Sequence, residues 1–134
     1  MTQIHDLSAA ELSRAFARGE LSPVEAARAA LARGEAWEPS IHAMYIVHRD
    51  AALAAAREAE ARWRGGAPLS PIDGVPVTIK ENIATAGDRV PIGTRANEAE
   101  PPAEADAPPA ARLREAGCVI LGKTTMPDYG MLSS

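Results

Sequence analysis

Hydrophobic residues recur at helical spacing in the first half of the chain and alternate with polar residues shortly after its midpoint. Ser8 and Ser22 each precede such a helical run, and each is followed three residues later by a glutamate. This is the spacing of a capping box, so we expect a helix to begin after each serine. Gly19 predicts the end of the first helix, and Gly34 lies near the predicted end of the second.

A short strand and a third helix are predicted next. Residues 41–47 mix aromatic and β-branched side chains, which is typical of a strand. Asp50 is placed to cap the third helix, and Glu58 and Arg62, four residues apart, are expected to pair on its solvent face. Residues 1–69 are therefore interpreted as a helical lead-in.

The second half of the chain has the pattern of a strand, a helix and a second strand. Residues 75–80 alternate apolar and polar positions, whereas residues 118–121 are continuously apolar, as in a strand buried on both faces. Between them lie a long irregular segment, residues 82–105, and a helix that Asp106 is placed to cap, with two prolines in its first turn. We expect a right-handed βαβ crossover with a parallel strand pair. The predicted fold class is α/β.

Two of the basic residues differ in type from all the others. Of 14 basic residues, only Lys80 and Lys123 are lysines, and all others are arginines. Both lysines fall at the predicted carboxyl ends of the two strands, where parallel sheets bind ligands. A desolvated lysine can give up its proton, whereas an arginine cannot. On this pattern alone, a lysine at a strand end is usually only a solvated charge.

Composition excludes several functional classes. The net charge of −4 gives no reason to expect nucleic acid or an anionic membrane surface as a partner. The chain has no apolar run of about 20 residues and no signal peptide at its start, so we expect a cytoplasmic protein. The single cysteine, Cys118, lies in the apolar run and is expected in the core rather than as a nucleophile. The three histidines are His5, His42 and His48. None has a carboxylate or a cysteine at metal-ligand spacing, so no metal site is expected.

Two separated blocks of the sequence resemble the amidase signature family of serine hydrolases, and they occur in the order found in that family. The first block is Pro71–Ile83, followed by Thr85–Gly87, and the second is Leu113–Pro127, preceded by Asp106. The resemblance implies a mixed, largely parallel sheet flanked by helices, of which residues 70–134 form the first βαβ part. In the family the residue after the lysine is most often aspartate, and here it is Glu81.

The resemblance also implies a catalytic set of a lysine, a serine with a cis peptide bond and a nucleophilic serine. Only the lysine matches here, as Lys80, which would act as the general base. Both serines would lie in and before a Gly-Gly-Ser-Ser-Gly-Gly stretch that this sequence lacks. Ser133 and Ser134 match the segment before the first catalytic serine. The chain is therefore expected to be the N-terminal part of a longer enzyme, truncated before the serine-rich loop and inactive by itself.

Three functional interpretations remain open. The first is an amidase that hydrolyses linear C–N bonds of small-molecule amides through an acyl-serine intermediate, without a cofactor and as a candidate homodimer. The second is an amidotransferase subunit that forms amide-charged tRNA, and the third is a non-catalytic α/β fragment. Met126, Tyr129 and Met131 are candidates for the substrate pocket, although ordinary packing explains them equally well. Lys123 is expected to make structural hydrogen bonds.

Overall fold

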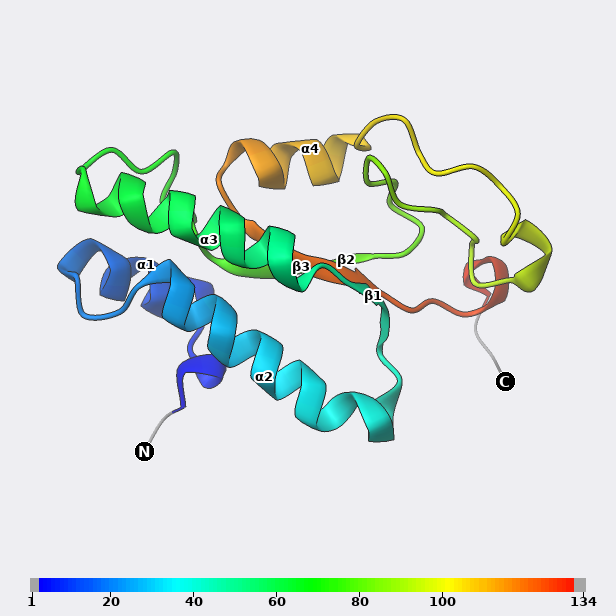
Figure 1. The fold of residues 1–134 in the computed structure, drawn as a ribbon, viewed down its shortest axis with the longest axis horizontal. Coiled ribbons are helices and arrows are strands. Elements are labelled where there is room, and N and C mark those ends of the chain that lie inside the picture. The colour runs from blue at the N-terminus through cyan, green and yellow to red at the C-terminus, as the bar shows by residue number, and fades with distance from the viewer. Residues whose placement is uncertain (1–2, 132–134) are drawn as a thin grey trace.

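A computed structural model describes residues 3–131. These residues form four α-helices and one mixed three-stranded sheet, with short 3₁₀ turns at Ile4–Asp6, Arg95–Asn97 and Asp128–Gly130 (Figure 1). The α-helices are α1 (Ala9–Arg18), α2 (Pro23–Ile41), α3 (Arg49–Arg64) and α4 (Pro108–Glu115), and the strands are β1 (Met44–Val47), β2 (Pro76–Lys80) and β3 (Val119–Thr124). The predicted α/β class is confirmed. No helix among the described residues is both long and apolar enough to cross a membrane.

The starts of α1 and α2 are as the sequence predicts. The hydroxyls of Ser8 and Ser22 each accept a hydrogen bond from the backbone N–H of the glutamate three residues on, which closes both capping boxes. The end of α2 differs from the prediction, because the helix passes through Gly34 and continues to Ile41. A glycine inside a helix costs only about 1 kcal/mol, and the surrounding alanines, arginines and glutamates favour the helix. The predicted strand at 41–47 is correspondingly shorter.

The predicted caps of α3 and α4 are wrong by one residue or more. His48 is the N-cap of α3, so Asp50 lies inside the first turn, and Ala107 is the N-cap of α4. Asp106 instead accepts a hydrogen bond from the Ala86 amide at 2.9 Å and pairs with an arginine of α4. Asp50 therefore lies in the first turn of α3, Asp106 makes a long-range contact, and neither is an N-cap.

The sheet has the order β1-β3-β2. Strands β2 and β3 are parallel and α4 lies between them in sequence, which confirms the predicted βαβ unit, while β1 adds an antiparallel edge. The register of the parallel pair shifts once, so that Val77 pairs with Ile120 but Thr78 pairs with Gly122. Leu121 is the extra residue at this bulge.

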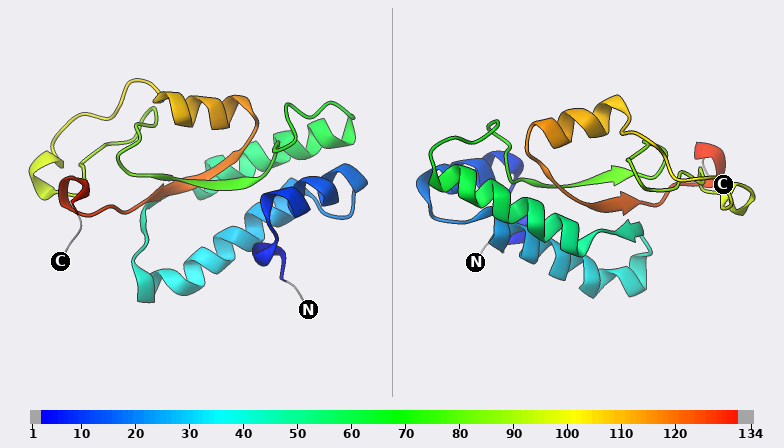
Figure 2. Two further views of the ribbon diagram at one scale, coloured as in Figure 1. Left: turned by 180° about the vertical axis from the view of Figure 1, so that it is seen from behind. Right: turned by 45° about the horizontal axis from the view of Figure 1, so that its top comes forward.

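Helices cover both faces of the sheet (Figure 2). On one face, α2 and α3 pack against β3 through a cluster of small and branched side chains, namely Val24, Ala27, Leu31, Ala52, Ala56, Val119 and Leu121. On the other face, Ala110 of α4 packs against Ile79 of β2 and Ile120 of β3. Helix α1 joins through Leu12 and Phe16, which pack near Val75. The carboxyl ends of β2 and β3 emerge together from this core.

Candidate functional site

Lys80 is the last residue of β2 and pairs with Thr124 of β3. Its neighbour Ile79 is buried against α4, and side chains alternate along a strand, so the Lys80 side chain projects from the opposite face. The Lys80 side chain is exposed. Residues 3–131 therefore fix the backbone of this lysine at the carboxyl edge and leave its side chain exposed.

Lys123 has the opposite environment. It is the residue of β3 that pairs with Ile79, and its side chain is fully buried. Burial lowers the pKa of the Lys123 ammonium, while the nearby carboxylates of Asp88 and Glu81 raise it in part. Within residues 3–131 its Nζ has no hydrogen-bond partner. The structural hydrogen bonds expected for Lys123 are therefore absent from the described part of the chain.

The turn before β2 is built around a buried ion pair. Asp73 is fully buried and accepts hydrogen bonds from Nε and Nη2 of Arg62, at 2.8 and 2.7 Å. The Leu69 amide donates to the same carboxylate, and the Trp63 indole donates to the Asp73 carbonyl oxygen. Hydrogen bonding to Asp73 raises the pKa of the Arg62 guanidinium. The predicted pairing of Arg62 with Glu58 is wrong, because the carboxylate across the turn offers two buried hydrogen bonds.

Glu81 connects the end of β2 to the loop that follows it. Its backbone N–H donates to the carbonyl oxygen of Thr124, and its buried carboxylate accepts a hydrogen bond from the Gly93 amide at 2.7 Å. The residue before Gly93, Ile92, in turn accepts a hydrogen bond from the Tyr129 amide. The segment after β3 is thus tied to the residue that follows Lys80. The sequence marks Glu81 only as a departure from the family pattern and does not predict its burial.

The three predicted pocket residues lie in that segment after β3. Met126 is half-buried, whereas Tyr129 and Met131 are 58% and 71% exposed. All three follow the carboxyl end of β3, which is Thr124.

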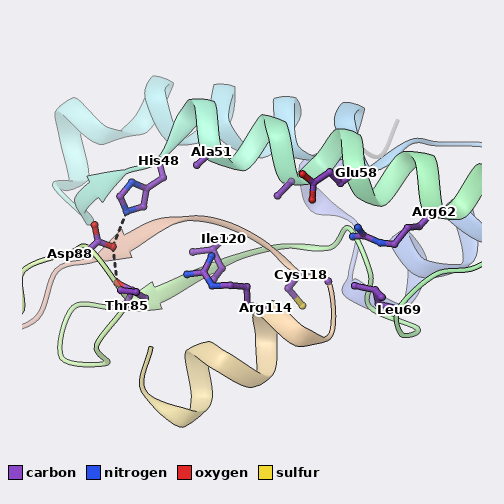
Figure 3. Close-up of a pocket in the computed structure, with 13 residues that line it drawn as sticks. His48, Ala51, Glu58, Arg62, Leu69, Thr85, Asp88, Arg114, Cys118 and Ile120 are labelled. Atoms are coloured by element: carbon purple, nitrogen blue, oxygen red, sulfur yellow. Dashed lines mark hydrogen bonds and ion pairs between the residues drawn. The ribbon is translucent and has the colours of Figure 1, made fainter. Parts of the chain in front are cut away.

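A separate cavity of about 340 Å³ lies between α3 and α4 (Figure 3). At one end Asp88 Oδ2 lies 2.9 Å from His48 Nε2 and accepts a hydrogen bond from Thr85 Oγ1 at 2.7 Å. Arg62 lies toward the other end, and Cys118 lines the wall. Burial raises the pKa of the Cys118 thiol, which fits a core residue rather than a nucleophile. Within residues 3–131 no group of three or more His, Cys, Asp or Glu side chains has the geometry to bind a metal ion.

The candidate site is thus a parallel βαβ unit with a lysine at the end of its first strand. The sequence model of the Amidase family matches residues 25–134, and the chain belongs to this family. Over its whole length the chain is 42% identical to a subunit of the glutamyl-tRNA(Gln) amidotransferase of Salinispora arenicola. Over 98% of its length it is 40% identical to the corresponding subunit from Myxococcus xanthus. It covers 27% of each of these relatives.

Solved structures agree with this assignment. The peptide amidase of Stenotrophomonas maltophilia superposes with a TM-score of 0.83 at 31% identity, over 92% of this chain and 26% of that one. A fatty acid amide hydrolase superposes with a TM-score of 0.86 at 26% identity, over 92% of this chain and 22% of that one. The chain thus spans about a quarter of the length of the proteins that it matches.

Proposed function

We propose that residues 1–134 form the N-terminal quarter of an amidase that hydrolyses linear C–N bonds of small-molecule amides through an acyl-serine intermediate. Lys80 is the general base of that enzyme. The observation that carries the proposal is the position of Lys80, at the carboxyl end of a parallel strand in a chain of the amidase family. Ligands of parallel sheets bind beyond this edge.

The chemistry requires Lys80 to lose its proton near neutral pH. A free lysine has a pKa of about 10.4 and is protonated there. In the proposed enzyme, residues beyond position 134 cover the exposed face from which Lys80 projects and remove its amine from water. The neutral amine then accepts a proton from the nucleophilic serine, through the second serine, as that serine attacks the amide carbonyl. Backbone N–H groups of the glycine-rich loop stabilise the oxyanion.

The chain contributes two parts to this enzyme. Residues 1–69 are the helical lead-in and residues 70–134 are the first βαβ part of the core. Met126, Tyr129 and Met131 lie on the substrate side of that core and contact the acyl group. Without the serines, the 134 residues have no activity by themselves. The enzyme acts in the cytoplasm, as a homodimer and without a cofactor.

A second candidate function is that of an amidotransferase subunit, which releases ammonia from an amide for the amidation of charged tRNA. The observation that favours it is the 42% identity to a subunit of a glutamyl-tRNA(Gln) amidotransferase. Both functions share the acyl-serine step, so Lys80 has the same role in each. They differ in the fate of the ammonia.

The two functions are tested with the complete polypeptide and primary amides, including glutamine. An amidase releases the carboxylic acid and ammonia in equal amounts and needs no partner. An amidotransferase subunit hydrolyses glutamine faster in the presence of its partner subunits and passes the ammonia on to an acylated tRNA. A polypeptide that cleaves no amide, alone or with such partners, would refute both.

A further inference from the structure

His48 lies where the edge strand, the central strand and a helix meet. It follows β1 and is the N-cap of α3. Its backbone N–H donates to the Leu121 carbonyl of β3, and its carbonyl oxygen accepts from the Ala52 amide in the first turn of α3, both at 2.8 Å. Its side chain makes no capping hydrogen bond. The backbone of His48 is therefore fixed by the core, and its ring is available for a contact elsewhere.

That contact is with Asp88, at one end of the cavity between α3 and α4 (Figure 3). Nε2 of His48 lies 2.9 Å from Oδ2 of Asp88, and the same oxygen accepts a hydrogen bond from Thr85 Oγ1 at 2.7 Å. A carboxylate only accepts hydrogen bonds, so Nε2 carries a proton and donates. The Asp88 side chain is 10% exposed and Thr85 is 2% exposed. The contact is therefore largely shielded from water.

Asp88 lies at the base of the long loop that joins β2 to α4. The Gly87 N–H donates to the Ala103 carbonyl, and the Ala103 N–H donates to the Asp88 carbonyl, both at 2.9 Å, so the two ends of the loop lie side by side. Within residues 3–131, the His48–Asp88 bond is the one hydrogen bond that connects residues 84–91 to a part of the chain outside this loop and the start of α4. His48 therefore attaches the base of the loop to the core.

The far end of this loop contacts the segment after β3. At its start the loop is fixed to β2, because the Ile83 N–H donates to the Lys80 carbonyl at 3.0 Å. Beyond Asp88, the Ile92 carbonyl accepts a hydrogen bond from the Tyr129 amide at 2.9 Å. Since Asp88 lies between these two attachments, a shift of Asp88 is transmitted toward Ile92 and from there to Tyr129.

We propose that His48 is a positioning residue, whose ring holds the base of the loop through Asp88 and thereby holds the segment that contains Met126 and Tyr129 in place for the amide substrate. That this segment faces the substrate rests on the function proposed above. The attachment of the loop by His48 does not, because it is a property of the described chain. The two statements can therefore be tested separately.

Nitrogen NMR of the histidine rings tests the contact in the natural polypeptide, without a substitution. The ring of His48 should carry a proton on Nε2, and this proton should exchange slowly with water because it is bonded to a shielded carboxylate. In Asp88→Ala the same proton should exchange too fast to observe. A His48 ring whose Nε2 carries no proton would overturn the inference.

Backbone hydrogen exchange then measures how firmly the loop is held. His48→Ala removes the donor, and we expect exchange at Gly87 and Ala103 to be about tenfold faster, since a hydrogen bond to a charged group is lost. His48→Gln places an N–H donor the same number of bonds from the backbone and should restore slow exchange. His5→Ala is the matched control, because His5 lies beside Asp6 in the first 3₁₀ turn and outside the loop. Equal protection in His48→Ala would overturn the inference.

A second variant keeps the test decisive if His48→Ala does not fold. Asp88→Ala removes the acceptor and leaves β1 and α3 unchanged, and we expect exchange at Gly87 and Ala103 to be about tenfold faster here too. In the Asp88→Ala background, His48→Gln should add no further effect, because the two residues act through one contact. Unchanged exchange in Asp88→Ala would contradict the proposal.

Kinetics of the complete polypeptide separate positioning from catalysis. His48→Ala should raise KM for an amide substrate about tenfold and change kcat by less than about threefold, with recovery in His48→Gln. An unchanged KM together with faster exchange would contradict the positioning role. Absence of amide hydrolysis in the parent polypeptide would refute the proposed function and leave the exchange result standing.

Discussion

Arg62 and Asp73 form a two-bonded ion pair that joins the last turn of α3 to the turn before β2. The Asp73 carboxylate is fully buried, and the Arg62 side chain is 26% exposed. Since the strand that ends in Lys80 begins three residues after Asp73, this pair sets where β2 enters the sheet. It joins the helical lead-in to the turn before the first strand of the core.

Replacement of Asp73 by asparagine should therefore destabilise the fold. The Arg62 charge would remain partly buried without its counter-charge, and we expect a loss of about 3 kcal/mol in the free energy of unfolding, measured by urea denaturation. Glu115→Gln is the matched control, because it breaks the exposed pair with Arg112, where both side chains are more than half exposed. That change should stay within about 0.5 kcal/mol. Equal effects of the two substitutions would show that the Asp73 pair contributes no more than a surface pair.

The residue before Cys118 must be glycine for the same carboxylate to fit. Gly117 has a φ of 85°, and a Cβ atom there would lie 2.2 Å from Asp73 Oδ1. We expect Gly117→Ala to cost about 3 kcal/mol, through backbone strain and displacement of the Arg62–Asp73 pair. Gly34→Ala, inside α2 with no atom within 4 Å of its Cβ position, should instead stabilise the chain by about 1 kcal/mol. Thermal unfolding of both variants compares these effects, and a neutral Gly117→Ala would contradict the described packing.

Because Asp106 pairs with Arg114, we expect the stability of the fold to depend on pH. The hydrogen bond from Arg114 holds the pKa of the Asp106 carboxyl below its ordinary value of about 3.9. A carboxyl whose folded-state pKa is depressed adds stability above its unfolded pKa, and that contribution is lost as pH falls through the folded-state pKa. We therefore expect the contribution to be complete at neutral pH and to disappear in the range below about pH 4.

This dependence is measured by urea denaturation of the parent chain and of Asp106→Asn at several pH values. The difference between the two should be largest near neutral pH and should shrink as the solution becomes acidic. Because Arg114 is 55% exposed, solvent screens the pair and keeps the difference small. A difference that is constant from neutral to acidic pH would show that Asp106 is not held in its ionised form.

Features fixed by neighbouring residues could be predicted from the sequence. The capping boxes at Ser8 and Ser22 lie within single turns, so spacing alone identifies them. The parallel pair follows from two apolar runs with a helix between them. In contrast, the partner of Arg62 is a carboxylate eleven residues away across a turn, and a pattern based on helical spacing pointed to Glu58 instead.

At the candidate site, the contacts between residues that are distant along the chain likewise could not be predicted. Lys80 and Lys123 occupy similar positions at the ends of two strands, and the sequence does not tell which is buried. The outcome depends on the bulge at Leu121, which places Lys123 opposite Ile79 on the face covered by α4. The burial of Glu81 likewise depends on Gly93, on a loop whose path the sequence does not specify.

The most direct measurement of the central claim is the kcat for amide hydrolysis by the complete polypeptide with Lys80 replaced. General-base catalysis typically contributes about 10²- to 10⁴-fold, so we expect Lys80→Ala to lose activity by a factor in this range. Lys80→Arg keeps the positive charge but cannot act as a base, and it should be as inactive as Lys80→Ala. Thr78→Ala, on the same exposed face of β2, is the control and should retain activity. Near-normal turnover in either Lys80 variant would contradict the assignment of Lys80 as the general base.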